Sequence, residues 1–401
     1  MNSKAILQPI LASLLAFVIA AGLGLAMRWA FVVDLPEWFN FRHIQHAHSH
    51  VALLGWLFSI FYLSIVHYFD LDYKKYFKLF WALQAMVLGM LLTFPLVGYA
   101  ALSIFFSTGH ILLSYVFVYQ VWRDLRVPKK EAWHIIFVKT SLFFMALSTL
   151  GTWALGPIMA MKLKGTAIYY AAIQFYLHFQ FNGWFIYAVI GLTLAILQNN
   201  SILLDAKKLK RFYWILTIAT LLTYALAISW STPYIGVFIV NSVGVILQLI
   251  ALIIFLQLII SKKEEIKRIF SLYVFRLFVL ALVALALKII IQAIIVIPYM
   301  AGVSYTIRNF VIGFIHLLML GCLSLFAFGV ISNIMKKPLN GWGTWIFIVG
   351  VVVTELLLFL QGFMLWQGFG FMSFYYLVVG LASGLIFIGV FIILLRLWKS
   401  N

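Results

Sequence analysis

The sequence is poor in cysteine and in charge. One of its 401 residues is cysteine, Cys322, so no intrachain disulfide can form and no cysteine-based zinc or iron–sulfur site can be built. Only 9% of the residues are charged, whereas 65% are hydrophobic, which excludes a soluble globular chain. The composition therefore predicts a protein that resides in a lipid bilayer.

The hydrophobic residues form twelve runs that are long enough to cross a bilayer as helices, which takes about 20 mostly apolar residues each. We expect spans at 6–33, 40–68, 76–97, 99–122, 134–160, 167–197, 212–230, 234–261, 272–297, 306–334, 342–363 and 374–396. No room remains for a soluble domain. The predicted fold is all-α, a polytopic bundle of twelve transmembrane helices that forms a single integral membrane domain over 1–401.

The net charge of +18 is concentrated in alternate connections between these spans. The basic residues concerned are Lys74, Lys75, Lys78, Arg123, Arg126, Lys129, Lys130, Lys207, Lys208, Lys210, Arg211, Lys262, Lys263, Lys267, Arg268, Lys336 and Lys337, with Lys4, Arg396 and Lys399 at the termini. Cytoplasmic loops of membrane proteins collect Lys and Arg, so the pattern predicts an N-in and C-in topology. The same pattern indicates that the positive charge faces the lipid bilayer and does not bind nucleic acid.

Four of the nine histidines crowd the start of the second span, at its outer end in this topology. At about 100° per helical residue, His43, His46 and His50 share one face, whereas His48 points away from it. The shared face could hold a copper or zinc ion with two or three imidazoles, or it could form a polar rim at the membrane surface. His48 could instead direct a single imidazole into the bundle.

His48, His110, His178 and His316 lie in one band, roughly 12–20 Å below the outer surface at about 1.5 Å per residue. A buried polar group without a hydrogen bond or metal costs about 2–7 kcal/mol, so each imidazole needs a partner. A hydrogen bond to a neighbouring carbonyl or hydroxyl is the ordinary solution, and for His110 we favour it over ligation.

A bis-histidine haem explains this band economically. Two neutral imidazoles from facing helices, His48 and His316, can hold a flat apolar macrocycle edge-on within a bundle. Arg42 and Arg308 lie at the outer ends of the same two helices, where they could pair with the propionates. The predicted cofactor is therefore a low-spin haem b.

Three short motifs surround the histidines of the second, sixth and tenth spans: His48-Ser-His-Val-Ala-Leu-Leu-Gly-Trp56, His178-Phe-Gln-Phe-Asn182-Gly-Trp184 and Gly313-Phe-Ile-His316. They resemble motifs of the heme-copper oxidase superfamily, closest to C-family oxidases and nitric oxide reductases. The resemblance implies that His48 and His316 ligate a low-spin haem and that His178 serves a non-haem metal. Twelve helices with both termini inside also match the plan of the superfamily's catalytic subunit.

The sequence departs from that family at its second metal centre. Phe314 stands where the family has the proximal histidine of a high-spin haem, and Asn182 replaces the reductases' glutamate. No histidine occurs between His178 and His316, so the usual binuclear centre cannot form. His178 is then a repurposed metal ligand, or it forms with Gln174 and Asn182 a polar stripe that lines a cavity or packs against another helix.

Charged residues are scarce inside the spans. Glu355 is the only carboxylate that we place there, against Lys139, Arg276 and Lys288. A proton pump would need more protonatable groups than these within its spans. Glu355 and Lys288 could form a buried pair, because each would be costly alone.

The expected function is that of a haem-binding membrane protein that transfers electrons or handles nitric oxide or oxygen. The His-rich second span also resembles NnrS-type haem-and-copper membrane proteins. An enzyme of this kind would be an oxidoreductase acting on nitric oxide or oxygen, although two axial histidines leave the iron no open position for substrate. The resemblance implies a quinol or cytochrome c as electron donor and, with the loop charges, a bacterial cytoplasmic membrane.

Two functions of other classes stay open. A cofactor-free transporter or metal-uptake protein would use the histidines of the second span as its entry site and would be colourless. The spans lack the paired Gly/Pro-interrupted half-helices typical of many transporters. An assembly or structural subunit, whose partner carries the chemistry, is the other alternative.

Overall fold

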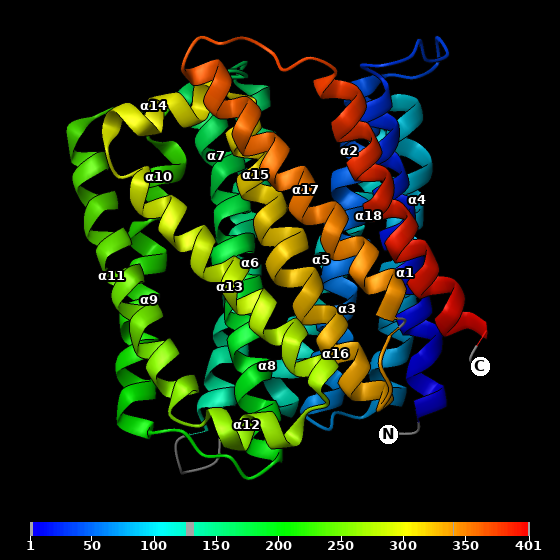
Figure 1. Ribbon diagram of the computed structural model, residues 1–401, viewed down its shortest axis with the longest axis vertical. Coiled ribbons are helices and arrows are strands. Elements are labelled where there is room, and N and C mark those ends of the chain that lie inside the picture. Colours follow the sequence, from blue (N-terminus) through cyan, green and yellow to red (C-terminus); the bar gives the residue numbers. More distant parts are fainter. Residues whose placement is uncertain (1–2, 126–131, 340, 400–401) are drawn as a thin grey trace. The chain divides into compact units, whose positions relative to one another are not determined.

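The computed structural model describes residues 3–125, 132–339 and 341–399, and these residues form helices and connections without any strand (Figure 1). Segments labelled η are π-helical. The elements are α1 Ser3–Trp29, α2 Phe41–His50, η1 Val51–Phe58, α3 Ser59–Tyr68, α4 Tyr73–Val97, α5 Ala101–Asp124, α6 Trp133–Ala160, α7 Ala167–His178, η2 Phe179–Phe185, α8 Ile186–Asn199, α9 Ala206–Leu222, α10 Tyr224–Ile228, α11 Ile235–Ile260, α12 Lys263–Ile269, α13 Leu272–Ile294, α14 Pro298–Thr306, α15 Arg308–His316, η3 Leu317–Ser324, α16 Leu325–Met335, α17 Gly341–Trp366 and α18 Tyr375–Lys399.

Twelve helices within the described residues are long and apolar enough to cross a membrane, which confirms the predicted number. Three of them are continuous runs interrupted by a π-helical segment: Phe41–Tyr68, Ala167–Asn199 and Arg308–Met335. The short helices α12 and α14 lie outside the spans. The protein is therefore a multi-pass membrane protein by the length and composition of its helices.

Two helices begin several residues before the apolar run that predicted them, because aspartates cap them. The side chain of Asp72 accepts a hydrogen bond from the backbone N–H of Lys74, and that of Asp205 accepts one from Lys208. The bond from Lys208 lowers the pKa of the Asp205 carboxyl below its ordinary value. N-caps thus extend the helices into basic sequence that hydropathy alone leaves outside the span.

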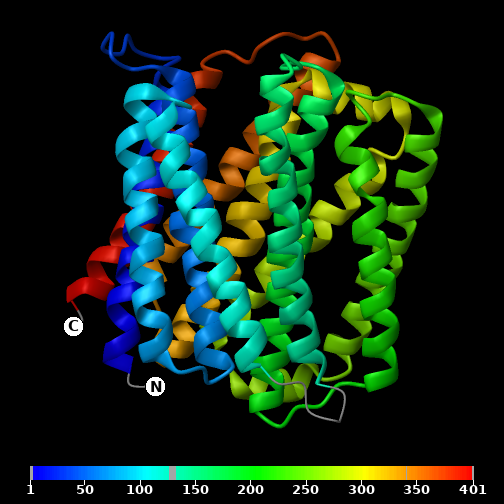
Figure 2. The same cartoon turned by 180° about the vertical axis from the view of Figure 1, so that it is seen from behind.

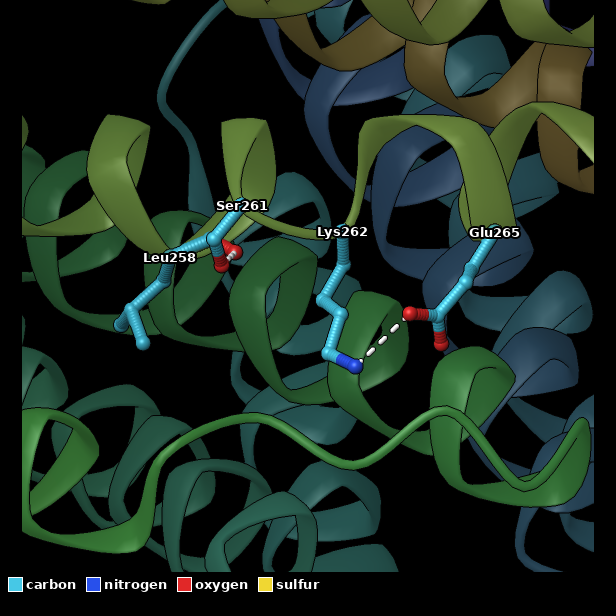
Figure 3. A network of polar contacts seen from close by, with 4 residues as sticks. All are labelled: Leu258, Ser261, Lys262 and Glu265. Carbon is cyan, nitrogen blue, oxygen red and sulfur yellow. Dashed lines mark hydrogen bonds and ion pairs between the residues drawn. The ribbon is translucent and has the colours of Figure 1, made fainter.

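One of the basic connections between helices, at Lys262, contains two local polar contacts. Between α11 and α12, the ammonium of Lys262 lies 2.7 Å from Oε1 of Glu265, and the hydroxyl of Ser261 donates to the carbonyl of Leu258 (Figure 3). Both contacts lie at the surface or close to it, so they fix a turn and add little stability. Arg126, Lys129 and Lys130, which we assigned to the same side of the membrane, lie outside the described residues.

The helices group into two compact units, each built from segments that are far apart in the sequence. The first unit consists of Met1–Phe117, Tyr273–Ala281 and Ile312–Asn401, and the second of Val118–Leu272 and Leu282–Val311. Each unit has a helical core of its own.

In the first unit, α18 packs against both α1 and α17, as the red, blue and orange ribbons of Figure 1 show. Two glycines allow α17 and α18 to touch: a Cβ added to Gly389 would lie 2.7 Å from the backbone oxygen of Gly343. The core next to them is aromatic. Phe17 of α1 stacks on Trp56 of η1 with their ring centroids 4.6 Å apart. Small residues at the contact and aromatic packing beside it are how helices associate without a hydrophobic driving force from water.

In the second unit, α6 packs against α7, η2 and α8, and α9 runs beside α11 (Figure 2). The ring of Phe144 on α6 stacks on that of Phe179 on η2, with centroids 5.6 Å apart. A Cβ added to Gly183 of η2 would lie 2.6 Å from the Cβ of Phe144, so a side chain there would push α6 away. The π-helical segment is therefore a packing surface of this unit.

Each π-helical segment begins at the residue after a histidine: η1 follows His50, η2 follows His178 and η3 follows His316. Five positions after each of these histidines stands a glycine, at Gly55, Gly183 and Gly321 respectively. π-Helical turns widen a helix by one residue per turn and occur often at functional sites. The second, sixth and tenth spans thus share a local structure that the other described helices lack, including α5 and α6, which carry His110 and His134.

Candidate functional site

The depth of His48 is set by the start of α2. The side chain of Asn40 caps that helix by accepting hydrogen bonds from the backbone N–H groups of Arg42 and His43, at 3.1 and 3.2 Å. His48 follows two helical turns later and turns its ring toward α1. Its Nδ1 lies 2.8 Å from the carbonyl oxygen of Ala20.

This contact fixes the tautomer of His48. A carbonyl oxygen only accepts hydrogen bonds, so the neutral ring must carry its hydrogen on Nδ1 and leaves Nε2 as an unprotonated lone pair. A metal-binding histidine is held in this way, with one nitrogen donating to a backbone carbonyl and the other on the metal. His48 is therefore prepared to act as a ligand through Nε2.

Gly24 of α1 makes room for the His48 ring. A Cβ added at Gly24 would lie 3.0 Å from Cε1 of that ring and 3.2 Å from Nδ1. We expect Gly24→Ala to displace the ring by a few tenths of an ångström and to weaken its bond to Ala20. Gly22 is the matched control, because a Cβ there would only touch Phe387 at 3.4 Å.

The two alanine variants should differ in thermal unfolding. Alanine is favoured over glycine within a helix by about 1 kcal/mol, so Gly22→Ala should raise the unfolding temperature. In Gly24→Ala we expect the displaced ring to cancel that gain. Equal stabilisation by both substitutions would show that the ring does not depend on Gly24.

His316 is the last residue of α15, and its ring differs from that of His48 in its hydrogen bonding. Its Nδ1 is buried, and no described residue forms a hydrogen bond with it. A polar atom left unpaired at this position in a span is costly. No described residue therefore holds the His316 ring as Ala20 holds that of His48.

The second and tenth spans run in parallel within the first unit. The indole N–H of Trp56 donates to the hydroxyl of Ser324 over 2.9 Å, and the amide of Asn333 donates to the hydroxyl of Tyr68 over 2.7 Å. The first bond also sets the register, since His48 precedes Trp56 by eight positions and His316 precedes Ser324 by eight positions. Because the two spans run parallel, both histidines lie at the same level, on the same side of this bond.

Two charged residues that the sequence analysis did not assign to this site accompany the imidazoles. The charge of Arg28, on α1, interacts with both His48 and His316. Arg28 is the only charged residue of the predicted span 6–33, and that isolation is the signal that could have identified it. The carboxylate of Glu355, on α17, also interacts with Arg28.

Glu355 reaches the histidine-bearing helix as well. Its Oε2 lies 3.3 Å from the position that a Cβ on Gly313 would occupy, one turn before His316. Both carboxylate oxygens are buried, and neither accepts a hydrogen bond from a described residue. Arg28, His48, His316 and Glu355 therefore form a polar cluster inside the first unit, which we call the Arg28 cluster.

Arg42 and Arg308, the predicted propionate cations, are both exposed at the beginnings of their helices. Arg42 is in the first turn of α2, in the first unit, and Arg308 is the first residue of α15, in the second. Arg28 is less exposed than either and interacts with both candidate ligands. Arg28 is therefore a third candidate cation, which the structure adds to Arg42 and Arg308.

His43, His46 and His50 share one face, as their spacing predicts, and this face packs on the end of α4 and the residues after it. Both nitrogens of His50 have partners, because Nδ1 lies 2.9 Å from the carbonyl of His46 and Nε2 lies 3.3 Å from the hydroxyl of Tyr99. The His46 ring meets Tyr99 edge-on at 4.5 Å. A Cβ on Gly98 would collide with the His43 ring at 2.6 Å.

No three His, Cys, Asp or Glu side chains converge to hold a metal ion anywhere in the part of the chain that the structure describes. The copper or zinc ion at His43, His46 and His50 thus stays a prediction. His110 lies on α5, in the first unit. Its ring meets Phe58 edge-on at 4.9 Å, and its Nε2 is buried without a hydrogen bond from any described residue.

His178 lies in the second unit, where both of its ring nitrogens have partners. Nε2 donates to the carbonyl of Thr220 over 2.8 Å, and Nδ1 lies 3.3 Å from the amide nitrogen of Asn182. Asn182 in turn accepts a 2.6 Å hydrogen bond from the ammonium of Lys288, which also donates to Gln292 over 2.7 Å. The polar stripe therefore packs against other helices, which is one of the two roles that its spacing allows.

The same bonds give Lys288 partners within its own unit, and its pairing with Glu355 stays a prediction. Its ammonium bonds two amide oxygens of its own unit, whereas neither oxygen of Glu355 accepts a hydrogen bond from a described residue. Amide oxygens satisfy the donors of an ammonium group without a second buried charge. The cost of burying Lys288 is thus met by Asn182 on η2 and by Gln292 on its own helix.

We expect Asn182→Leu to destabilise the protein by about 3 kcal/mol or more, because it deprives a buried ammonium of an acceptor and His178 of a donor. The free energy of unfolding in mixed micelles measures this. Gln174→Leu, one turn before His178 on the same stripe, is the control and should cost less. Adding Lys288→Met to Asn182→Leu should recover part of the loss, and a purely additive effect would contradict the network.

No family model matches this sequence, and no curated protein matches it either.

Proposed function

We propose that this chain is a haem-binding integral membrane protein in which His48 and His316 ligate the iron of one b-type haem. The observation that carries the proposal is the parallel register of the second and tenth spans, joined by the Trp56–Ser324 bond. With this register the two imidazoles lie at one level. The His48 ring donates from Nδ1 to the carbonyl of Ala20, which leaves a lone pair on Nε2, and Nδ1 of His316 has no hydrogen bond with a described residue. Two neutral imidazoles are the axial donors of a low-spin haem.

The surrounding residues fit such a group. Gly24 lets the His48 ring lie close against α1, and Gly313 lets Phe359 and Glu355 lie close to the helix one turn before His316. Arg28, with Arg42 at the start of α2, would hold the propionates by charge-assisted hydrogen bonds. The haem, when bound, supplies a one-electron iron centre, whereas the chain positions it and sets the charge around it.

Electron transfer is the activity that these residues favour. His48 and His316 would together hold the iron, so a gas such as nitric oxide or oxygen would bind only by displacing one of them. In this proposal the protein lies in a bacterial cytoplasmic membrane with both termini inside and accepts electrons from a quinol or a cytochrome c. Its relation to the heme-copper oxidases is supported by the twelve spans and by histidines in the second, sixth and tenth.

The test is the reduced-minus-oxidised absorption spectrum of the detergent-purified protein, together with its haem content. We expect the α-band of a six-coordinate haem b and one haem per chain. Carbon monoxide added to the reduced protein should leave the spectrum unchanged, because no coordination position is open. A protein that stays colourless after expression with ample haem supply would contradict the proposal and favour the cofactor-free transporter.

A further inference from the structure

A groove in the second unit is unrelated to the histidines. It lies between α6 and α9, with the last turn of α5 at one end, and has a volume of about 400 Å³. The residues that matter for its chemistry are Trp122, Lys139, Thr140, Phe143, Tyr213 and Leu221. They belong to three spans but to a single compact unit.

One end of the groove is polar and cationic. The ammonium of Lys139 lies 5.5 Å from the ring centroid of Trp122, an attractive cation–π distance. No carboxylate lies within ion-pair distance of Lys139 among the residues that the structure describes. A cation in an apolar span without a counter-ion is costly, and an anion brought by a ligand would offset that cost.

Two hydroxyl groups lie beside this cation. Thr140 and Tyr213 form a hydrogen bond of 2.8 Å across the groove, from α6 to α9. Two hydroxyl groups carry two hydrogens, and their mutual bond uses one, so the other can be donated to a ligand oxygen. Lys139 and this pair together offer a charged donor and a neutral donor to one anionic group.

The rest of the groove is apolar and open. Phe143, one turn after Lys139, is 51% exposed, and Leu221, two turns after Tyr213, is 50% exposed. These exposed fractions lie within membrane-spanning helices, so the surfaces they describe face hydrocarbon. A ligand that fits this shape has an anionic head and an apolar chain.

The charge around the polar end favours an anion from the bilayer itself. α9 begins with the basic run Lys207, Lys208, Lys210 and Arg211, at the same end of the helix as Tyr213, and α5 ends with Arg123. Basic residues at the membrane surface attract anionic lipids by about 1 kcal/mol each.

From the uncompensated cation, the hydroxyl pair and the open apolar wall, we infer that the groove binds one anionic phospholipid. Its phosphate lies at Lys139 and the Thr140–Tyr213 pair, and one acyl chain lies along Phe143 and Leu221.

The test is native mass spectrometry of the full-length protein titrated with phosphatidylglycerol or with phosphatidylcholine of the same acyl chains. We expect the first phosphatidylglycerol to bind at least fivefold more tightly than phosphatidylcholine. Lys139→Leu should abolish that preference, whereas Lys139→Arg should retain it. Lys162→Leu, which removes an exposed lysine beyond the other end of α6, is the control and should keep the preference of the wild type.

A second variant tests the apolar part while leaving the cation in place. Leu221→Trp fills the groove and should weaken phosphatidylglycerol binding at least fivefold. Equal binding of the two lipids, or an unchanged preference in Lys139→Leu, would overturn the inference. Displacement of the lipid by millimolar inorganic phosphate would also overturn it, because the site would then recognise the anion alone. Preferential displacement by a short-chain quinone would overturn it in favour of a quinone site.

Discussion

The single variants His48→Ala and His316→Ala should each lose most of the haem from the purified protein. The expected loss of haem affinity exceeds tenfold, because even the residues that merely orient a ligand contribute about 10–100-fold to metal affinity. The absorbance of the haem relative to protein in size-exclusion fractions measures the effect. Both single variants should resemble the double variant, since one remaining imidazole leaves a weak five-coordinate site.

The controls are His67→Ala and His134→Ala, which remove imidazoles near the ends of their spans. Both should keep the haem content and spectrum of the wild type. Imidazole added to His48→Gly should restore the six-coordinate spectrum, because the small ligand can occupy the space that the side chain leaves. If all four alanine variants kept one spectrum, the assignment of the ligands would be wrong.

Arg28→Leu should lower the midpoint potential of the haem. A positive charge close to the iron disfavours the ferric state, so its removal stabilises that state and the potential falls. For a unit charge at about 10 Å and an effective dielectric constant of about 20, the interaction is about 1.7 kcal/mol, which corresponds to about 70 mV for one electron. A redox titration of the reconstituted protein measures this shift.

Two arginine variants sharpen that experiment. Arg28→Lys retains the charge and should shift the potential much less than Arg28→Leu does. Arg42→Leu removes an exposed charge, which solvent and salt screen, and should shift it less than Arg28→Leu as well. A potential that rises in Arg28→Leu, or that responds more strongly to Arg42→Leu, would show that Arg28 is not the cation closest to the haem.

The number of spans could be predicted because hydrocarbon imposes a length and a composition on every helix that crosses it. The starts of α4 and α9 could not be read from hydropathy, since Asp72 and Asp205 extend both helices into lysine-rich sequence. An aspartate just before such a run is the capping signal that would have placed them. Hydropathy locates the membrane-spanning part of a helix, and the N-cap residue locates the position where the helix begins.

The candidate site was predictable only in part. Helical spacing separates His48 from the face of His43, His46 and His50. It does not reveal Arg28, because that residue lies on α1, which carries no histidine. The partners of His178 come from Thr220 and Asn182, and no local pattern joins the first of these to the histidine. Such tertiary hydrogen bonds decide whether a buried imidazole is free to ligate.

The π-helical segments were beyond prediction from periodicity. A π-helical turn differs from an α-helical one by a single residue, so the apolar pattern of 51–58 or 317–324 reads as ordinary helix. The recurrence of glycine five positions after His50, His178 and His316 is visible only once the three segments are known. A Cβ on Gly55 would lie 2.9 Å from that of Ala16, which explains the need for glycine at one of them.

The most direct test of the two-histidine ligation is electron paramagnetic resonance with hyperfine spectroscopy of the oxidised protein, labelled with ¹⁵N-histidine. A low-spin ferric signal coupled to two histidine nitrogens is the predicted result, and His316→Ala should eliminate one coupling. A high-spin signal in the wild type, or coupling to a single histidine that survives both His48→Ala and His316→Ala, would contradict it.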